Sequence, residues 1–137
     1  MLEFELRKIK YFDAGSEETP CFTAEIWENG KKVADVSNEG QGGGNRVDHL
    51  QGTSYKDVQK FDNLDVEAEI FRRVWLNDDV KRNQGKGIVL NKGDEIAIVK
   101  FPIPITKWKK HPQYASWNKN AIDKYEAQGY TIMNTNL

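Results

Sequence analysis

Cysteine and long apolar runs are both scarce in this sequence of 137 residues. Cys21 is the only cysteine, so no intrachain disulfide can form and a zinc site built on cysteines is excluded. No apolar stretch reaches the length of a membrane span or of the hydrophobic part of a secretion signal. The sequence therefore predicts a protein of a reducing compartment, cytoplasmic and without a membrane partner.

The chain also lacks an excess of charge of either sign. Its 20 basic and 21 acidic side chains nearly cancel, which removes the sequence-wide electrostatic argument for binding nucleic acid or an anionic membrane. Six Phe, five Tyr and four Trp remain to build an interior. A chain of 137 residues suffices for one hydrophobic core but not for two of ordinary size. We therefore expect one folded domain over residues 1–137.

The N-terminal residues show the alternation typical of a β-strand. Apolar and charged residues alternate over 2–6, and the alternation resumes in the other phase over 9–11. A change of phase inside a strand requires one extra residue on that strand. The pattern therefore predicts an opening strand with a bulge near Lys8.

A β-hairpin is expected over residues 21–38, because Asn29-Gly30 separates two strand-like runs. Two loops are compatible with this sequence. A two-residue loop places Ala24 opposite Asp35, which spoils an otherwise apolar face. A three-residue loop with a left-handed Gly30 places Ala24 opposite Ala34 and keeps the face apolar. The pattern favours the three-residue, bulged loop.

The remaining patterns predict two helices and three more strands. Apolar residues at helical spacing indicate a long helix over 64–82, with Asn63 or Asp62 as its N-cap. A shorter helix is expected over 114–127, followed by a Gly129 cap. The expected strands after the first cover 21–28, 31–38, 87–90, 95–101 and 130–134.

These elements define an α+β fold class. We expect a single domain with a mainly antiparallel sheet, built from two hairpins plus terminal strands. The sheet should be packed against one long helix and a C-terminal helix.

Residues 39–54 form a segment almost without periodicity, and they hold five of the eleven glycines. We interpret this segment as a long loop, of the kind that often carries function. Its glycines can present successive backbone N–H groups to a phosphate, with Arg46 supplying charge. The segment matches neither GxxxxGK[ST] nor GxGxxG, so a connector without a ligand is the alternative.

A second polar segment, Ser16–Thr19, lies between the first two expected strands. Its two carboxylates and two hydroxyls suit weak cation binding or contact with a basic partner, although a hydrogen-bonded turn explains the same residues. The predicted ligand-binding residues come from these two segments and a neighbouring histidine: Ser16, Glu17, Glu18, Thr19, Gly42, Gly43, Gly44, Asn45, Arg46 and His49.

No pattern of residues indicates catalysis. His49 and His111 are the only histidines, and nothing in their spacing brings either to a nucleophile. Asp48 and His49, as neighbours on an extended segment, point to opposite faces. Cys21 has no partner base nearby in the sequence. The sequence therefore predicts no catalytic residue, no metal site and no cofactor.

Basic and aromatic side chains interleave over residues 107–119, a mixture that contacts phosphates and stacks on bases. The alternative is that the tryptophans anchor a helix in the core while the lysines are solvated. The candidate nucleic-acid-binding residues are Lys107, Trp108, Lys109, Lys110 and Trp117, with His111, Tyr114 and Lys119 beside them.

The string SEETPCFTAEIWENGKKVADVSNEGQGGGN, residues 16–45, resembles small uncharacterised proteins of bacteriophages and prophages that share the pattern SEET, NGKKV and VSN[ED]GxGG. The run KYEAQGYTIMN is similar to the end of the same proteins. A histidine often stands in those proteins where this sequence has Gln41. The resemblance implies a phage-type origin, transfers no residue role, and ranks segments 16–19 and 40–45 first for testing.

These expectations combine into one hypothesis with two alternatives. The hypothesis is a non-enzymatic accessory protein of phage type, in the host cytoplasm, which binds a host protein or a small nucleotide-like ligand through loops that include 39–46. An inhibitor of a host defence system would be one such protein. The first alternative is a nucleotide- or phosphate-binding protein or a nucleotide hydrolase using the glycine-rich loop and Arg46. The second is a nucleic-acid binder using residues 107–119. The oligomeric state stays open, a homo-oligomer included.

Overall fold

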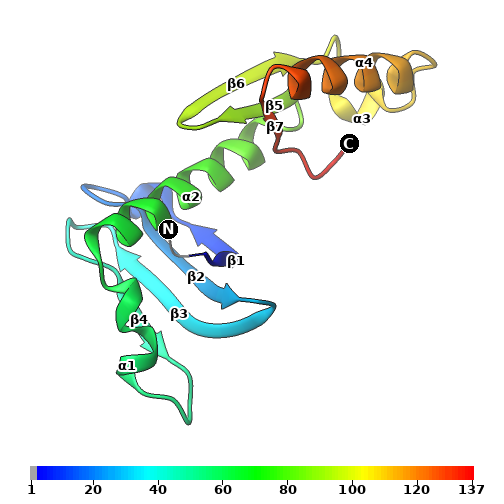
Figure 1. Ribbon diagram of the computed structural model, residues 1–137. Coiled ribbons are helices and arrows are strands. Elements are labelled where there is room, and N and C mark those ends of the chain that lie inside the picture. Colours follow the sequence, from blue (N-terminus) through cyan, green and yellow to red (C-terminus); the bar gives the residue numbers. More distant parts are fainter. Residues whose placement is uncertain (1–2) are drawn as a thin grey trace. The chain divides into compact units, whose positions relative to one another are not determined.

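The computed structural model describes residues 3–137 and confirms the α+β class (Figure 1). Within that range, seven strands form two antiparallel sheets. The chain divides into two compact units, one ending at Asp78 and the other running from Asp79 to Leu137. The two expected hairpins therefore lie in separate sheets instead of sharing one. Leu2, where the expected alternation begins, lies outside the described residues.

The elements have the following bounds. The strands are β1 (Glu5–Tyr11), β2 (Cys21–Glu28), β3 (Lys31–Glu39), β4 (Arg46–His49), β5 (Gly87–Lys92), β6 (Glu95–Lys100) and β7 (Thr131–Ile132). The helices are α1 (Tyr55–Val58), α2 (Leu64–Asn83), α3 (Ile105–Trp108) and α4 (Tyr114–Ala127), with 3₁₀ turns at Asp13–Gly15 and Gln59–Phe61.

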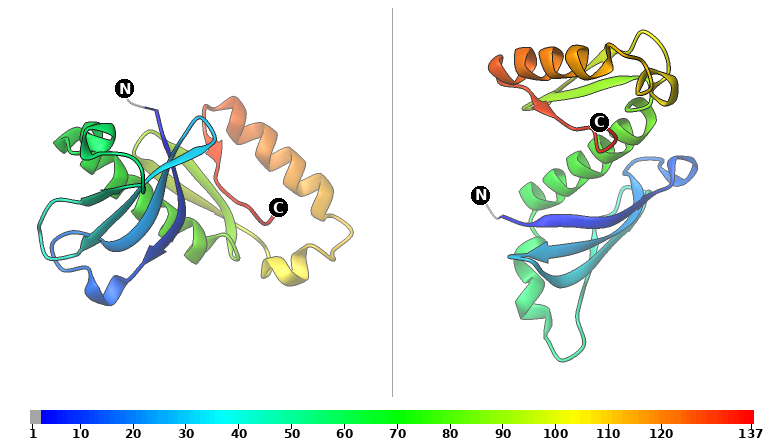
Figure 2. Two further views of the ribbon diagram at one scale, coloured as in Figure 1. Left: turned by 90° about the horizontal axis from the view of Figure 1, so that it is seen from below. Right: turned by 90° about the vertical axis from the view of Figure 1, so that its right-hand side faces the viewer.

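The first unit is built on a four-stranded sheet in the order β1-β2-β3-β4 (Figure 2). Alternate residues of β2 and β3 turn apolar side chains to one face, and Ile70 and Val74 of α2 join them in one core. Ile70 and Val74 are fully buried, and each such side chain stabilises the fold by about 1.5–3 kcal/mol. The buried members of this core are Phe4, Phe22, Ala24, Ile26, Ala34, Val36, Val58, Phe61, Ile70 and Val74.

The predicted bulge in the first strand is confirmed. Arg7 pairs with Glu25, but Lys10 pairs with Thr23, so β1 carries one more residue than β2 between these pairs. Lys8 has a φ of 52°, the left-handed conformation that such an insertion uses. The bulge keeps the apolar side chains of both halves of β1 on the core side.

The predicted three-residue loop of the first hairpin is wrong. Glu28 pairs with Lys31 across a two-residue loop, and Asn29 and Gly30 both have positive φ, at 51° and 78°, as a type I′ turn requires. The apolar face is restored elsewhere, because a bulge at Val33 shifts the register by one residue.

The bulge moves Ala24 opposite Val36 and Phe22 opposite Asn38, so the face that includes Ala24 stays apolar up to Asn38. The sequence pattern shows that one extra residue is needed. It does not show where along the strand that residue is inserted.

A further expectation, near the middle of the chain, is corrected. Strand β4 lies inside the segment predicted as a loop, where Ser37 pairs with Arg46 and Ala34 with His49. Four residues alternate too briefly to be distinguished from a loop by periodicity. The short helix α1 follows it, with the Asp57 carboxylate accepting a hydrogen bond from the Ser54 amide at 2.8 Å. The long helix itself is confirmed, capped by the Asn63 side chain on the Asp65 amide at 2.8 Å.

The second unit is a three-stranded sheet in the order β6-β5-β7, covered on one face by α4 (Figure 1). Helix α4 has the predicted bounds and ends in a Schellman motif, in which the Tyr130 amide donates to the Tyr125 carbonyl at 3.0 Å. The buried core of this unit comprises Ile88, Leu90, Phe101, Ile105 and Trp108. Among residues 3–137, no helix is long and apolar enough to cross a membrane.

Candidate functional site

The structure brings together the two segments that the sequence ranked first. The carbonyl oxygen of Gly40 accepts hydrogen bonds from the amides of Glu17 and Glu18, at 2.9 and 3.0 Å. The Gly42 amide donates to the Thr19 hydroxyl at 3.3 Å. The segment Ser16–Thr19 and the segment Gly40–Asn45, called here the glycine loop, therefore form one structure at the end of the hairpin β2-β3.

Asn38 is the centre of this structure. Its side-chain oxygen accepts hydrogen bonds from the Thr19 hydroxyl at 2.7 Å and from the Gly40 amide at 2.8 Å. Its side-chain nitrogen donates to the Gly43 carbonyl at 2.9 Å and to Asn45 Oδ1 at 3.1 Å. Asn38 is only 7% exposed, so these bonds form in a water-poor environment where each is costly to lose.

Two of the glycines are required, Gly40 by close approach and by its backbone conformation, and Gly42 by its backbone conformation. Gly40 has a φ of 85°, and a Cβ placed there would lie 2.1 Å from the Gly15 carbonyl oxygen. Gly42 has a φ of 92°, and its Cβ would lie 2.2 Å from a carboxylate oxygen of Glu18. A side chain at Gly40 would collide with the backbone of the opposite segment, whereas at Gly42 it would meet the end of the exposed Glu18 side chain, which can move. At both positions the positive φ would strain a residue that has a side chain. At Gly43, by contrast, a Cβ would have nothing within 4 Å.

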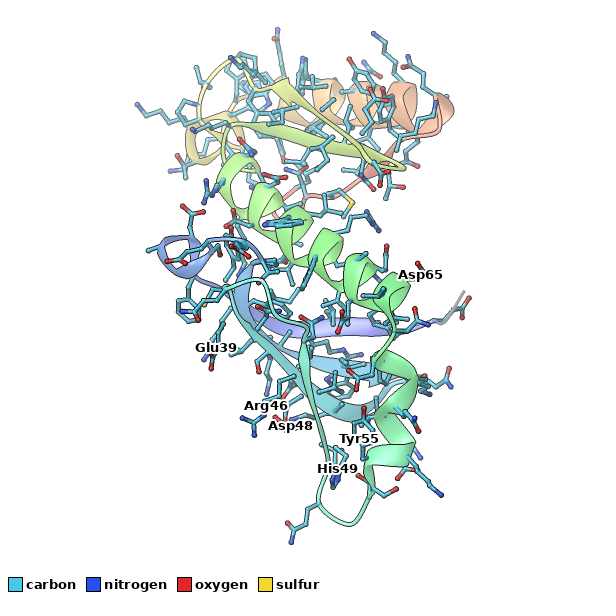
Figure 3. All side chains as sticks on the ribbon, turned by 90° about the vertical axis from the view of Figure 1, so that its left-hand side faces the viewer. Glu39, Arg46, Asp48, His49, Tyr55 and Asp65 are labelled. Carbon is cyan, nitrogen blue, oxygen red and sulfur yellow. The ribbon has the colours of Figure 1, made fainter. Side chains whose placement is uncertain are left out.

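The glycine loop borders a surface depression of about 410 Å³. Figure 3 shows Arg46 and Asp48 close together on β4, with Glu39 on the neighbouring strand and His49 at the far end of β4. Arg46 donates to Asp48 at 3.1 Å, while its side chain stays 78% exposed. The depression is lined by Ser37, Asn38, Glu39, Gln41, Gly43, Gly44 and Arg46. Its lining includes no apolar side chain.

The geometry differs from that of the glycine-rich phosphate loops. The amides of Gly40, Gly42 and Asn45 are already bonded to protein side chains, the last to Glu67 Oε1 at 3.1 Å. A strand, β4, follows the loop where a phosphate loop leads into a helix N-terminus. What remains for an anion is the Arg46 guanidinium and the exposed backbone of Gly43 and Gly44.

The hydroxyls of the Ser16–Thr19 segment hold the fold. Ser16 Oγ donates to the Phe12 carbonyl at 2.9 Å and accepts from the Cys21 amide at 2.8 Å, while Thr19 donates to Asn38. Glu17 and Glu18 are exposed. The structure thus supports the hydrogen-bonded turn for the hydroxyls and leaves the two carboxylates on the surface.

The remaining sequence candidates lie apart from the depression. His49 Nδ1 lies 3.1 Å from the Leu50 carbonyl oxygen and 3.3 Å from Thr53 Oγ1, within its own turn. Cys21 is half-buried at the start of β2. Within residues 3–137, no group of His, Cys, Asp and Glu side chains is arranged to hold a metal ion.

A row of three carboxylates crosses the outer face of the sheet beside the depression. Glu25 pairs with Asp35, and Asp35 pairs with Asp48 on the next strand. Like charges placed opposite each other repel, and Lys32 relieves this by bonding Glu25 at 3.0 Å and Asp35 at 2.9 Å. Hydrogen bonding to Lys32 lowers the pKa of Glu25, and the bond to Asp35 raises that of Lys32.

Sequence reasoning missed Asn38 and Ser37 as residues of the site, and it included Glu39 and Gln41 only as members of the segment 39–46. A signal for Asn38 exists in the sequence. It falls on the same face as Ala34 and Val36, so it is a polar residue at a position where alternation demands an apolar one. A buried amide in such a place requires partners, and the nearby glycine loop supplies them.

The aromatic residues of the basic segment form a core. Trp108 is 4% exposed and meets Trp117 and Tyr114 edge to face, with ring centroids 5.7 and 6.1 Å apart. Trp108 is therefore unavailable for stacking on a base in this structure. The lysines Lys107, Lys109, Lys110 and Lys119 and the side chain of His111 are exposed.

Comparison with family models, with curated proteins and with solved structures found no match to this chain.

Proposed function

We propose that the chain is a non-enzymatic accessory protein of phage type that binds a host protein at the depression beside the glycine loop. The observation that supports this most is the hydrogen bonding of Asn38. It holds Gly40 and Gly43 in place by bonds within the chain, so the loop needs no ligand to take its shape. A surface ordered in advance loses less entropy on binding.

The chemistry of the lining favours a protein over a small molecule as the partner. Small-molecule sites are concave and mostly apolar, with few polar groups. This depression carries the hydroxyl of Ser37, the carboxylate of Glu39, the amide of Gln41 and the guanidinium of Arg46. Such a mixed polar surface suits the backbone and charged side chains of a protein loop.

Affinity purification from lysate of the bacterial host tests the proposal. The tagged wild type is compared with Gln41→Ala/Arg46→Ala, and with the matched surface variant Lys119→Ala/Asn120→Ala on α4. We expect one host protein that the wild type and the α4 variant retain and that the loop variant loses at least tenfold. Equal recovery on all three baits, or recovery of no protein, would contradict binding through this depression.

A second candidate function is nucleotide binding, favoured by the exposed Arg46 guanidinium beside the open backbone of Gly43 and Gly44. Native mass spectrometry of the purified chain would then show an added mass in the nucleotide range. Arg46→Ala should abolish calorimetric binding of that nucleotide and leave the circular dichroism spectrum unchanged. Unchanged binding by Arg46→Ala would exclude this candidate and leave the protein-binding proposal standing.

A further inference from the structure

Strand β6 is an open edge without the protection that the edge strands β1 and β7 have. Within the part of the chain that the structure describes, it pairs only with β5, from Glu95 opposite Lys92 to Lys100 opposite Gly87, with no bulge. The edge strand β1 of the other sheet is broken by its bulge at Lys8, and β7 has only two residues. Bulges and shortness are common devices against pairing with a second chain. Strand β6 has neither.

The backbone of β6 offers free hydrogen-bonding groups along this edge. Lys92 and Glu95 flank a two-residue loop, so Glu95 and every second residue after it bond to β5. The Phe101 amide, which donates to the Lys86 carbonyl at 2.8 Å, continues the same alternation. The peptide groups of Ile96 and Ile98 therefore point away from β5, toward the open edge.

The side chains of β6 add an apolar surface with a charge at each end. Ile96 and Ile98 are each 39% exposed, on the face opposite the one that packs in the core with α4. Asp94 precedes the strand and Lys100 ends it. Neither makes an ion pair with any residue in the described range 3–137.

We propose that two copies of this chain dimerise by antiparallel pairing of β6 with the partner's β6, about a twofold axis at Ala97. This pairing sets Ile96 opposite the partner's Ile98, with both residues directing their peptide groups to each other. It also sets Asp94 opposite the partner's Lys100, and the twofold axis repeats this ion pair at the other end of the paired strands. The two three-stranded sheets become one six-stranded sheet with both copies of α4 on the same face.

The charges select this register among the alternatives. A shift by two residues keeps the same faces together but places Lys100 opposite the partner's Ile96, so both ion pairs are lost. A shift by one residue places the apolar outer face of one β6 beside the core face of the other. The free peptide groups of Ile96 and Ile98 then face peptide groups that are already bonded to β5. Ala97, which lies on the axis, has a side chain small enough for the close approach of a non-hydrogen-bonded pair.

Exchange of the two charges tests the pairing. Sedimentation velocity should show the wild type as a dimer, at twice the chain mass of 15.8 kDa. Asp94→Lys or Lys100→Asp alone should weaken dimerisation by about tenfold, because two attractive pairs become repulsive. The double variant Asp94→Lys/Lys100→Asp should recover the wild-type dissociation constant. Asp123→Lys, the same charge change on the exposed surface of α4, should have no effect.

Hydrogen exchange locates the interface independently. The amides of Ile96 and Ile98 should become protected as concentration rises, while those of Ala97 and Val99 stay protected at every concentration. Ile98→Pro removes an outward amide that the β5-β6 ladder does not use, so it should abolish the dimer and keep the β5-β6 hairpin.

A wild type that stays monomeric up to about 1 mM, where even weak pairing is populated, overturns the proposal. So does a double charge exchange that fails to restore the dimer. Failure of the dimer proposal would leave the proposed host-protein binding untouched, and the reverse also holds, since no residue of β6 lines the depression.

Discussion

Thr19 donates its hydroxyl to the side-chain oxygen of Asn38 at 2.7 Å, across nineteen residues of sequence. This bond joins the loop before β2 to the end of β3, and the Gly40 amide donates to the same oxygen. The shape of the glycine loop is therefore set by a buried amide outside the loop. Four predictions follow from this and other contacts of the described residues.

Asn38→Ala should lower the free energy of unfolding by about 2–4 kcal/mol, because several buried groups lose their partner together. Thr19→Val removes one donor and should cost about 1 kcal/mol. Urea denaturation followed by circular dichroism measures both. Thr23→Val, at an exposed position of β2, should change stability by less than about 0.5 kcal/mol. Equal losses at Thr19 and Thr23 would speak against the role of Asn38.

Gly40→Ala should destabilise the chain by about 3 kcal/mol or more, because its Cβ would meet the Gly15 carbonyl and its φ disfavours a side chain. Gly43→Ala, in the same loop, has open space and should be neutral within about 0.5 kcal/mol. Thermal unfolding of the two variants side by side makes the comparison. A tolerated Gly40→Ala would mean that the loop does not contact Gly15.

Stability should fall with acid through Glu69. Arg72 donates two hydrogen bonds to this carboxylate and Arg73 donates one, each of 2.9 Å, and together they lower the pKa of Glu69 to about 2 from 4.5. A pKa below the unfolded value means stabilisation that is present above about pH 4.5 and is lost as the pH falls toward 2. At neutral pH it amounts to at most about 3 kcal/mol.

Glu69→Gln tests this titration. The variant should be less stable than the wild type at pH 7, and the difference should shrink between about pH 5 and pH 2. Denaturation in urea at each pH gives the two curves. Parallel curves would show that Glu69 does not contribute in this way.

Trp108→Ala should destabilise the second unit by about 3–5 kcal/mol, as expected for a large buried aromatic residue. Lys109→Ala, next to it but exposed, should be close to neutral. If the lysines of this segment bind nucleic acid, that binding must rest on phosphate contacts and fall steeply with added salt. A fully folded and stable Trp108→Ala protein would contradict the core role of this residue.

The regular elements were predictable where local pattern and burial agree. The bounds of α4 follow from helical spacing before a Gly129 cap, and the bulge at Lys8 follows from a change of phase. The loop of the first hairpin was not predictable in this way. The pattern requires one extra residue, and a bulge in the loop or a bulge at Val33 satisfies it equally well. Strand β4 was missed because its pairing with β3, and not its own sequence, makes it a strand.

The candidate site was predictable only as two segments. Ser16–Thr19 and the glycine loop stand out by composition, but nothing local shows that Asn38 joins them. The hydroxyls of Ser16 and Thr19 looked available for a ligand, whereas the fold uses them internally.

The sequence by itself determined the α+β class, the long helix α2 and the absence of a cysteine framework, because periodicity and composition are local properties. The tertiary structure alone decided that the two hairpins lie in separate sheets, that Asn38 orders the glycine loop, and that β6 is left as an open edge. These depend on which strands pair and which polar groups meet, and such contacts join residues that the sequence keeps far apart.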